Sequence, residues 1–356
     1  MSHLGKSLIF GAVLGSAMAV AVTAQSAEYK WRMATAVAEN SYFYNDFVKR
    51  FADEAKTLTN GREEITPYGA GVIAPAFKVY DAVSDGLVET GHSSPGYLTN
   101  KDPVNALMAA FAGGMSAEAA LHWLYFGGGR EMWIKFREQE MELHPLIVGM
   151  HGSEIYAHSR KPIRVAADLK GLKFRTAGSN AWILKEKFGA NPVSAAQAEI
   201  YGLLERGAID AAEFATPGAN VSDGYYEVAK YVIVPGIHTP NSVWEAVIKK
   251  DRWDALPADI KTELEEAARL TTIDSLLQCG VDDLAAIQKF RDHGNEIVQM
   301  DPSLVQKYRE YGREWGQTMA AQQKAKGNLW MEKFLKSYTE FQDTWAKNAV
   351  YRVKDE

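Results

Sequence analysis

The sequence has few of the residues that form cross-links or membrane spans. Only one of its 356 residues is a cysteine, Cys279, so the chain can form no internal disulfide and contains no cysteine-rich metal site. It has one long apolar run, Leu8 to Ala24, and no later stretch is long or apolar enough to cross a membrane. The folded protein must therefore be stabilised by its hydrophobic core.

The chain also lacks the signatures of common enzymes. It contains no H-E-x-x-H, G-x-S-x-G, Walker A or G-x-G-x-x-G sequence. His144, His151 and His158 are spaced by seven residues, but the proline and glycines between them exclude a shared helical face, so we expect no zinc site there. No nucleophile, base and orienting group form a recognisable set. We therefore expect a protein that is not an enzyme.

The charge balance excludes a further class of function. Lys and Arg number 39 and Asp and Glu number 45, which gives a net charge of −6. Because this mild acidic excess is spread along the chain, nucleic acids and anionic membranes are not expected as partners. The apolar content of 47% is that of an ordinary globular protein, and the length predicts one large domain or two coupled ones.

Residues 1–27 are typical of a secretory signal peptide. Lys6 supplies the positive charge, Leu8 to Ala24 supplies the apolar region, and small residues follow where cleavage would occur. The alternative is a membrane anchor, but this apolar run falls short of the roughly 20 residues that a spanning helix needs. We therefore predict an exported protein.

After the signal peptide, short β-like runs alternate with amphipathic helices, which is the pattern of an α/β fold with a parallel sheet. We predict strands at residues 29–36, 63–68, 87–93, 172–176, 191–193 and 208–214. We predict helices at residues 41–58, 74–83, 179–188 and 196–204, with Ser179 and Ser194 as N-caps of the last two.

Two segments of the chain resemble each other. Each contains a helix end, a glycine cap, a short strand with an acidic residue, and then Pro-Gly where the strand stops. The first segment is Asp85 to Gly96 and the second is Arg206 to Gly218. Two such α/β units in one exported chain predict two lobes of similar build that face each other.

The predicted secondary structure changes after Pro235, from alternating short strands and helices to long helices. A helical pattern runs from Asp259 to about His293, and at about 1.5 Å per residue it would span on the order of 50 Å, longer than one small lobe. We therefore expect this helix to cross both lobes. The C-terminal segment, residues 301–356, carries many large apolar groups, which either pack on their own domain or form a subunit interface.

Ligands of open α/β sheets bind outside the carboxyl ends of the strands, so candidate site residues are sought there. Arg175 follows a strand and precedes a helix N-terminus, where a guanidinium can bind a carboxylate, although a surface ion pair is the alternative. Glu213 lies in an otherwise apolar strand, so it must be paired, solvated in a cleft or bound to a cation, and a salt bridge at a hinge is the alternative without a ligand. The full set at strand ends is Ser93, Ser94, Tyr97, Arg175, Glu213 and Phe214.

A family resemblance rests on five segments in order: Phe77–Gly86, Tyr125–Gly129, Ala167–Arg175, Leu204–Glu213 and Arg252–Pro257. The combination of A-D-L-K-G-L-K-x-R with a later L-x-x-G-x-I-D-A-A-E is specific, although neither half would suffice. Through these segments the mature chain resembles the periplasmic solute-binding proteins of TRAP (tripartite ATP-independent periplasmic) transporters. The likeness is greatest to the branch that binds α-keto acids and lactate.

The resemblance implies an α/β, two-lobed periplasmic-binding-protein fold with a long helix crossing both lobes and a helical C-terminal extension. The implied lobe I comprises residues 28–150 with about 238–275, lobe II comprises 151–237 with about 276–300, and residues 301–356 form the extension, which joins two subunits in a homodimer. The implied function is capture of a small organic carboxylate in the periplasm by lobe closure, followed by its delivery to the TRAP membrane permease subunits.

The resemblance also implies roles for residues of this sequence. Arg175 would bind the ligand carboxylate, and Tyr97 would donate a hydrogen bond to it. A bridging cation, Ca²⁺ or Na⁺, would be held by Glu213, by the backbone carbonyl of Phe214, and by Glu154, which stands where the family has Gln. No organic cofactor is expected. The substitution Arg175→Ala is expected to abolish binding without unfolding the protein.

Two departures from the family leave the ligand open. Glu154 adds a second carboxylate, which favours Ca²⁺ over Na⁺, or lets the two glutamates receive an ammonium or hydroxyl group of the ligand without a metal. Ile237-His238 replaces an aromatic pair, so the wall beside the ligand is more polar and His238 becomes a candidate ligand contact. The alternatives to a 2-oxo or 2-hydroxy acid receptor are a receptor for an amino-acid-like or aromatic carboxylate and a ligand-sensing periplasmic protein.

Overall fold

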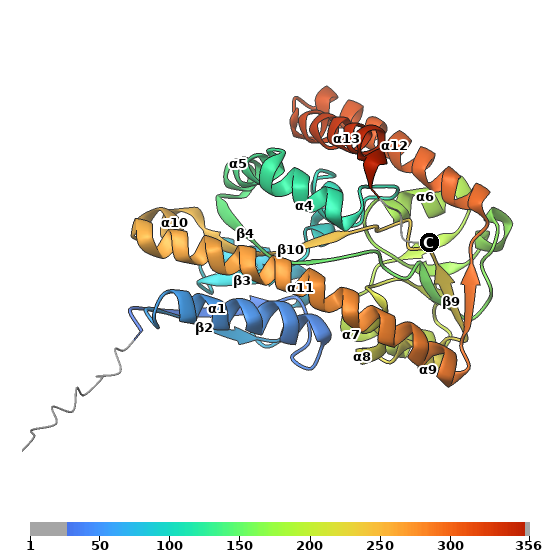
Figure 1. Cartoon of the computed structure of the whole chain (residues 1–356), viewed down its shortest axis with the longest axis horizontal. Coiled ribbons are helices and arrows are strands. Elements are labelled where there is room, and N and C mark those ends of the chain that lie inside the picture. Colours follow the sequence, from blue (N-terminus) through green and yellow to red (C-terminus); the bar gives the residue numbers. More distant parts are fainter. Residues whose placement is uncertain (1–26, 353–356) are drawn as a thin grey trace, which may run out of the picture.

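The computed structural model describes residues 27–352 and is shown in Figure 1. The predicted signal peptide, residues 1–27, lies outside the described residues except for its last member. Within residues 27–352, no helix combines the length and the apolar character needed to cross a membrane.

Two β-sheets form the centre of the molecule. The first has the strand order β2-β1-β3-β10-β4 and the second has the order β11-β9-β5-β8-β6-β7. The strands of the first sheet are β1 (Tyr29–Thr35), β2 (Glu63–Tyr68), β3 (Thr90–Ser93), β4 (Leu143–His151) and β10 (Ser242–Lys249). Those of the second are β5 (Ala157–Ser159), β6 (Lys173–Arg175), β7 (Asn191–Val193), β8 (Ala211–Ala212), β9 (Tyr231–Val234) and β11 (Glu296–Gln299).

Both sheets are mixed, so the prediction of a parallel sheet is wrong for one strand of each. Strand β10 runs antiparallel to β3 and β4, and β5 runs antiparallel to β8 and β9. Each of these strands enters its sheet directly from the other sheet, by way of residues 152–156 or 235–241, with no crossover helix. A parallel connection needs such a crossover, whereas an antiparallel strand does not. These two stretches, the crossing segments, pair with each other through a bridge between Glu154 and Gly236.

The helices cover the outer faces of the sheets (Figure 1). The helices of the first half are α1 (Arg50–Leu58), α2 (Val79–Ser84), α3 (Asn105–Met108), α4 (Ala117–Phe126), α5 (Gly129–Met141), α6 (Gly178–Phe188) and α7 (Gln197–Glu205). Those of the second half are α8 (Pro217–Ser222), α9 (Tyr225–Val228), α10 (Lys250–Ala255), α11 (Ala258–His293), α12 (Pro302–Ala325) and α13 (Trp330–Asn348). Short non-α turns of helix occupy residues 44–49, 76–78, 95–98, 166–169 and 349–351.

The long helix α11 crosses both lobes, as the sequence pattern predicts. It contains 36 residues, which corresponds to about 54 Å at 1.5 Å per residue. It packs against α1 and β4 of the first lobe and against α8, α9 and β11 of the second. Two of its hydroxyl groups hold the end of β4: Thr272 donates to the carbonyl of Ile147 and Ser275 accepts from the amide of Met150. The helix therefore links the sheets independently of the crossing segments.

The two segments of the sequence that resemble each other, Asp85 to Gly96 and Arg206 to Gly218, occupy equivalent places in the two sheets. Strand β3 lies between a parallel neighbour, β1, and the antiparallel β10, and β8 lies between a parallel neighbour, β6, and the antiparallel β5. Gly86 and Gly207 precede these strands in the left-handed region, with φ of 72° and 68°, which favours glycine. Each strand leads to a proline in the first turn of the next helix, Pro95 or Pro217. The two units therefore point the ends of β3 and β8 at the junction between the sheets.

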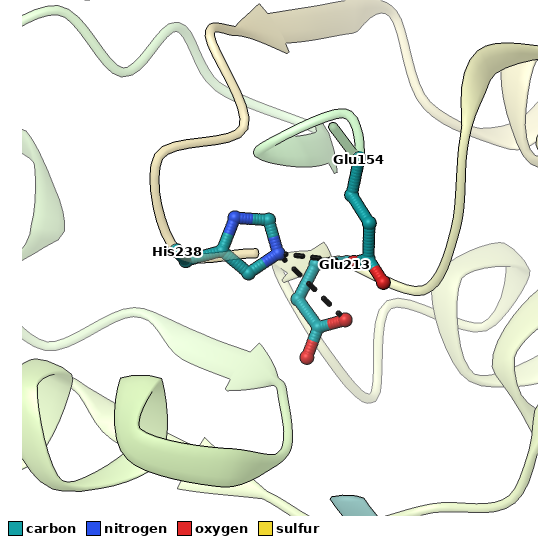
Figure 2. A group of neighbouring side chains, drawn as sticks. All are labelled: Glu154, Glu213 and His238. Atoms are coloured by element: carbon teal, nitrogen blue, oxygen red, sulfur yellow. Dashed lines mark hydrogen bonds and ion pairs between the residues drawn. The ribbon is translucent and has the colours of Figure 1, made fainter. Parts of the chain in front are cut away.

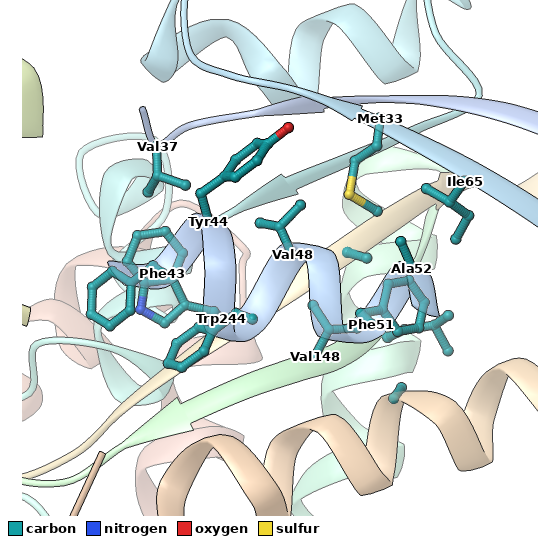
Figure 3. Close-up of a cluster of buried hydrophobic side chains, with 14 of the residues drawn as sticks. Met33, Val37, Phe43, Tyr44, Val48, Phe51, Ala52, Ile65, Val148 and Trp244 are labelled. Atoms are coloured by element: carbon teal, nitrogen blue, oxygen red, sulfur yellow. The ribbon is translucent and has the colours of Figure 1, made fainter. Parts of the chain in front are cut away.

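The main hydrophobic core contains side chains from both sheets, and Figure 3 shows part of it with residues of the first lobe labelled. The ring of Phe43 is the central contact, at 4.7 Å from Phe47, 4.9 Å from Trp244 and 5.9 Å from Phe214, measured between ring centroids. Phe43, Phe47 and Trp244 belong to the first lobe, whereas Phe214 follows β8 of the second. The apolar core thus continues to the edge of the junction between the lobes.

The C-terminal extension packs on its own chain. Helix α12 lies against α6, and α13 lies against α4 and α5. Trp315, Phe334 and Tyr338 are buried, and the Tyr338 hydroxyl accepts a hydrogen bond from the amide of Met115 at 2.8 Å. Of the two explanations for the apolar tail, intramolecular packing therefore accounts for these three side chains.

The predicted N-caps Ser179 and Ser194 are both wrong by a few residues. Ser179 lies inside α6, and its hydroxyl donates to the carbonyl of Ala110 at 3.0 Å and accepts from the amide of Ala112 at 2.9 Å. Tertiary contact with the segment before α4 therefore uses the hydroxyl that the local pattern assigned to a cap. Helix α7 begins after Ala196, whose amide donates to the Glu199 carboxylate at 2.8 Å instead.

We expect Glu63 to make the stability of the protein depend on pH. It is fully buried at the start of β2, neither carboxylate oxygen has a hydrogen-bond partner among the described residues, and burial raises its pKa to about 9. Between its ordinary pKa and this value the folded state holds a proton that the unfolded state releases, so stability falls as pH rises. Glu63→Gln should therefore raise the Tm by several degrees at pH 8 and change it little at pH 5. Thermal unfolding at both pH values measures this effect.

The matched control is Glu64→Gln on the same strand. Glu64 is partly exposed and pairs with Lys56 at 3.2 Å, an exposed contact worth about 0–1 kcal/mol. Its substitution should change the Tm slightly, and by a similar amount at both pH values. An equal Tm gain at pH 5 and pH 8 for Glu63→Gln would contradict the assignment.

Candidate functional site

Three strand ends and the crossing segment of residues 152–156 meet at a small cavity of about 30 Å³. The end of β3 brings Ser94 and Tyr97, the end of β6 brings Arg175, and the end of β8 brings Glu213. The full lining comprises Ser94, Gly96, Tyr97, Ala109, Ala110, His151, Glu154, Arg175, Ala177, Glu213, Phe214, Ser242 and Trp244. Both lobes therefore contribute walls to one cavity, which we call the inner cavity.

The guanidinium of Arg175 is held in a fixed orientation in this wall. It is 2% exposed, so the surface ion pair considered from the sequence is wrong. Nε and Nη2 donate to the carbonyl of Ala195 at 3.1 and 3.0 Å, and Nη1 donates to the carbonyl and carboxylate of Glu213 at 2.6 and 3.3 Å. The Phe214 ring lies 5.4 Å from the guanidinium carbon. Since a guanidinium has five N–H groups and these bonds use at most four, Arg175 keeps a donor for a ligand.

Glu213 connects the parts of the site. One carboxylate oxygen accepts from the amide of Ala177 at 2.7 Å, and the other pairs with Arg175. That second oxygen also lies 3.9 Å from Nε2 of His238. Glu213 is therefore paired with Arg175 and also lines the cavity. The salt bridge and the place in a ligand cavity, which the sequence analysis treats as alternatives, occur together.

The two crossing segments place a second pair of an acidic and a basic side chain, Glu154 and His238, beside Glu213 (Figure 2). Nε2 of His238 lies 3.1 Å from a carboxylate oxygen of Glu154. Glu154, Glu213 and His238 are all buried, and each offers one ligand atom within 4.8 Å of the others. Two carboxylate oxygens and an imidazole nitrogen form a donor set that fits a cation.

The protonation states here follow from burial. Burial raises the pKa of Glu154 well above its ordinary value, the charge of Glu213 raises it further, and Arg175 opposes both. Burial lowers the pKa of His238 to about 4 and that of His151 to about 4. At neutral pH the imidazoles are therefore neutral, and Glu154 keeps its proton to a higher pH than an exposed glutamate does. A cation bound by Glu154 would favour the deprotonated carboxylate, because a metal ligand must be deprotonated.

The hydroxyl of Tyr97 and the indole Nε1 of Trp244 are buried polar groups of this wall that have no hydrogen-bond partner among residues 27–352. The oxygen is buried, and burial raises its pKa to about 12. A buried hydroxyl without a partner costs free energy unless a ligand or water supplies one. Tyr97 is therefore placed to donate a hydrogen bond to a bound molecule.

Most of the site residues predicted from the sequence meet at this cavity. Six of them line it, whereas Ser93 does not: Ser94, Tyr97, Glu154, Arg175, Glu213 and Phe214. His238 does not line it, so its prediction as a direct ligand contact is not supported by this geometry. Its Nε2 instead contacts the carboxylates of Glu154 and Glu213, at 3.1 and 3.9 Å.

Sequence reasoning missed two aromatic groups of the wall. Trp244 and His151 line the cavity, and each stacks on a ring of the core, His151 on Phe43 at 5.3 Å and Trp244 on His92 at 5.3 Å. The pairing register of β4 and β10 places them there, and no local pattern in the sequence reveals that register. In the sequence, His151 stands out only through its regular spacing from His144 and His158, which predicts no zinc site.

Comparisons with known proteins identify relatives along most of the chain. The family described as bacterial extracellular solute-binding protein, family 7, matches residues 33–323. A monocarboxylate 2-oxoacid-binding periplasmic protein of Nostoc sp. is 29% identical over 284 residues, which is 78% of this chain and 75% of the relative.

Two solved structures of TRAP solute-binding proteins share the fold. One, from Pseudoalteromonas atlantica with bound sodium and pyruvate, has a TM-score of 0.83 and 27% identity, covering 90% of this chain and 95% of its own. The other, from Bordetella bronchiseptica, is a mixed occupancy dimer with copurified calcium and picolinate. It has a TM-score of 0.84 and 23% identity, covering 91% of this chain and 94% of its own.

The buried pair predicts a stability role for Arg175 in addition to any role in binding. Arg175→Ala would leave Glu213 as an unpaired buried carboxylate, and loss of one partner of a buried pair costs about 3–5 kcal/mol. We therefore expect a clear fall in the free energy of unfolding, measured with urea, and partial recovery in the double variant Arg175→Ala, Glu213→Gln. The exposed Arg206→Ala serves as the control. An unchanged unfolding midpoint for Arg175→Ala would contradict the pairing.

Proposed function

Because the chain belongs to family 7 of the bacterial extracellular solute-binding proteins, a family with the two-lobed fold of TRAP receptors, we propose that it captures a small monocarboxylate. The ligand is a 2-oxo or 2-hydroxy acid, and the protein delivers it in the periplasm to the membrane permease subunits of a TRAP transporter. The observation that carries this proposal is the single oriented guanidinium, Arg175, facing a cavity that both lobes line.

The contacts of Arg175 support a carboxylate as the ligand group. Its orientation is fixed by Ala195 and Glu213, so use of the spare N–H group requires little further ordering of the side chain. The unpartnered hydroxyl of Tyr97 lines the same space from the other lobe. A ligand carboxylate held by both side chains would bind the two lobes to each other. Closure and binding would then be one event.

A cation is the second part of the proposal. Glu154 and Glu213 supply carboxylate oxygens, and we assign the third ligand to the backbone carbonyl of Phe214. Two carboxylates favour Ca²⁺ over Na⁺, because affinity for Ca²⁺ rises with the ligand charge. The solved relatives with pyruvate and with picolinate contain sodium and calcium, respectively.

The remaining features of the proposal concern the whole molecule. We divide it into lobe I (28–150 and about 238–275), lobe II (151–237 and about 276–300) and the C-terminal extension (301–356). The crossing segments would act as the hinge. The protein would bind without catalysis and function as a homodimer, as in the calcium-containing relative. A receptor for an aromatic or amino-acid-like carboxylate, with Glu154 and Glu213 contacting the ligand directly, is the alternative without a metal.

Thermal unfolding of the mature protein tests both parts together. With pyruvate at 100 times its Kd, the free energy of unfolding should rise by about 2.7 kcal/mol, which appears as a higher Tm. We expect this Tm shift in the presence of Ca²⁺ and its loss in EDTA. Acetate, which lacks the oxo group, is the control ligand and should give a smaller shift. A pyruvate shift that EDTA leaves intact would exclude a bridging Ca²⁺ and leave the carboxylate site standing.

The variant Glu154→Gln tests whether Glu154 determines which cation is bound, separately from whether pyruvate is bound at all. The variant keeps the size of the side chain and removes one negative charge, so its pyruvate affinity in Ca²⁺ should fall at least tenfold while binding in Na⁺ is retained. Isothermal titration in the two salts measures the change. Glu205→Gln, an exposed substitution in the same lobe, should leave both affinities unchanged. Equal affinities for wild type and Glu154→Gln in Ca²⁺ would show that Glu154 is not a cation ligand.

A further inference from the structure

Helix α11 carries a row of exposed aliphatic side chains on the face opposite its contacts with the two lobes. We call this row the α11 stripe, and its members are 37–77% exposed: Leu270, Ile273, Leu277, Val281 and Leu284. Figure 1 shows α11 lying across both lobes on the side turned to the viewer. A surface helix of a globular protein usually presents polar groups on this face. The α11 stripe therefore has the character of an interaction surface.

A groove beside the stripe extends the apolar surface onto lobe I. It lies between α4 and α11 and has a volume of about 390 Å³. Ile273 belongs to both the stripe and the groove, and Phe126, the last residue of α4, lines the groove and is 91% exposed. The full lining comprises Leu121, His122, Tyr125, Phe126, Glu266, Arg269 and Ile273. The apolar surface is therefore wider than one helix face, as a contact with another protein surface requires.

The spacing of the stripe is symmetric about its central member, Leu277. Leu270 and Leu284 lie seven residues before and after it, and Ile273 and Val281 lie four residues before and after it. Because an α-helix turns by about 100° per residue, all five side chains fall within an arc of about 80°. Such a palindromic row is complementary to its own copy in the antiparallel direction, which is the property that a twofold interface needs.

An antiparallel pair with its axis at Leu277 has definite contacts. Leu277 would meet Leu277 of the partner subunit. Ile273 would meet Val281 of the partner subunit, and Leu270 would meet Leu284 of the partner subunit. Each large aliphatic group of the stripe would thus be covered by another, with no member left facing water or a charge.

Polar residues continue this symmetry beyond both ends of the stripe. Glu266 and Gln288 lie eleven residues before and after the central leucine, so the carboxylate of one would face the amide of the other across an antiparallel pair. Glu265, which pairs with Arg130 of its own chain at 3.2 Å, would likewise face Lys289 of the partner subunit. A parallel pair would instead oppose each acid to its own copy. Because opposite charges across a contact fix its orientation, these residues favour the antiparallel arrangement.

We propose that the α11 stripe is the interface between two copies of this chain, paired through antiparallel α11 helices about a twofold axis at Leu277. This inference rests on the homodimer of the proposed function and places its interface on α11, whereas the family resemblance implies the C-terminal extension. Helices α12 and α13 of that extension pack on their own chain. The start of α11 contacts lobe I through Asp259 and its end contacts lobe II through Phe290. Lobe I of one subunit would therefore lie beside lobe II of the partner.

Sedimentation equilibrium of the mature protein tests the interface through the variant Leu277→Glu. The wild type should have the mass of two chains. The variant places two carboxylates against each other at the axis, so it should raise the dimer Kd by at least roughly a hundredfold and halve the mass. Leu277 is 65% exposed in the single chain and no residue of α11 lines the inner cavity. The variant should therefore fold and keep the pyruvate affinity of the wild type, measured by isothermal titration in Ca²⁺.

The variant Val350→Glu is the matched control. It places the same charge at a side chain that is 80% exposed and belongs to the C-terminal extension. We expect it to keep the mass of two chains. If Val350→Glu falls to the mass of one chain and Leu277→Glu does not, the interface lies on the extension and the inference is wrong.

A mixture of two variants tests the antiparallel register. Leu270→Lys and Leu284→Glu each place a charge against a leucine, so each alone should have the mass of one chain. Their equimolar mixture should recover the mass of two chains, because one contact then joins the two introduced charges and the other joins two leucines. A mixture that remains at the mass of one chain would show that these positions do not meet.

The outcomes separate the interface from the proposed function. A wild type with the mass of one chain at every concentration, or a Leu277→Glu dimer as tight as the wild type, would overturn the inference whether or not pyruvate binds. If the masses agree with the inference and neither protein binds pyruvate, the proposed solute fails and the α11 interface stands.

Discussion

The buried pair of Arg175 and Glu213 is the interaction on which the site depends. Each partner comes from the end of a different strand, β6 or β8, and the guanidinium also fixes the segment at Ala195 through its carbonyl. Such a pair costs desolvation free energy, which the mutual attraction and the further hydrogen bonds of the two groups offset. The pair and the contacts with Ala195 together fix the orientation of the guanidinium in the cavity wall.

The segments that connect the two sheets supply the side chains that surround the pair of Arg175 and Glu213. Two similar α/β units direct the ends of β3 and β8 at the junction, while the crossing segments bring Glu154 and His238 to the same place. These segments are extended stretches held to each other by few hydrogen bonds, including the amide of Glu154 to the carbonyl of Thr239 at 3.1 Å. The continuous helix α11 limits how the lobes can move, since it packs on both.

Much of this arrangement could be predicted from the sequence, because it is encoded locally. The glycine caps at Gly86 and Gly207, the alternating elements and the polar groups at strand ends all produce recognisable patterns over a few residues. The antiparallel strands, the position of Trp244 and the contact of Ser179 with Ala110 depend on how distant segments pair, and no short pattern carries that information. The proximity of His238 to Glu154 belongs to the same group, since 84 residues separate them.

A crystal structure of the mature protein with pyruvate and Ca²⁺ tests the central claim most directly. The account predicts one carboxylate oxygen within hydrogen-bond distance of Arg175 and of the Tyr97 hydroxyl, with a cation held by side-chain oxygens of Glu154 and Glu213. A ligand bound elsewhere, or bound in this cavity with its carboxylate directed away from Arg175, would contradict the account.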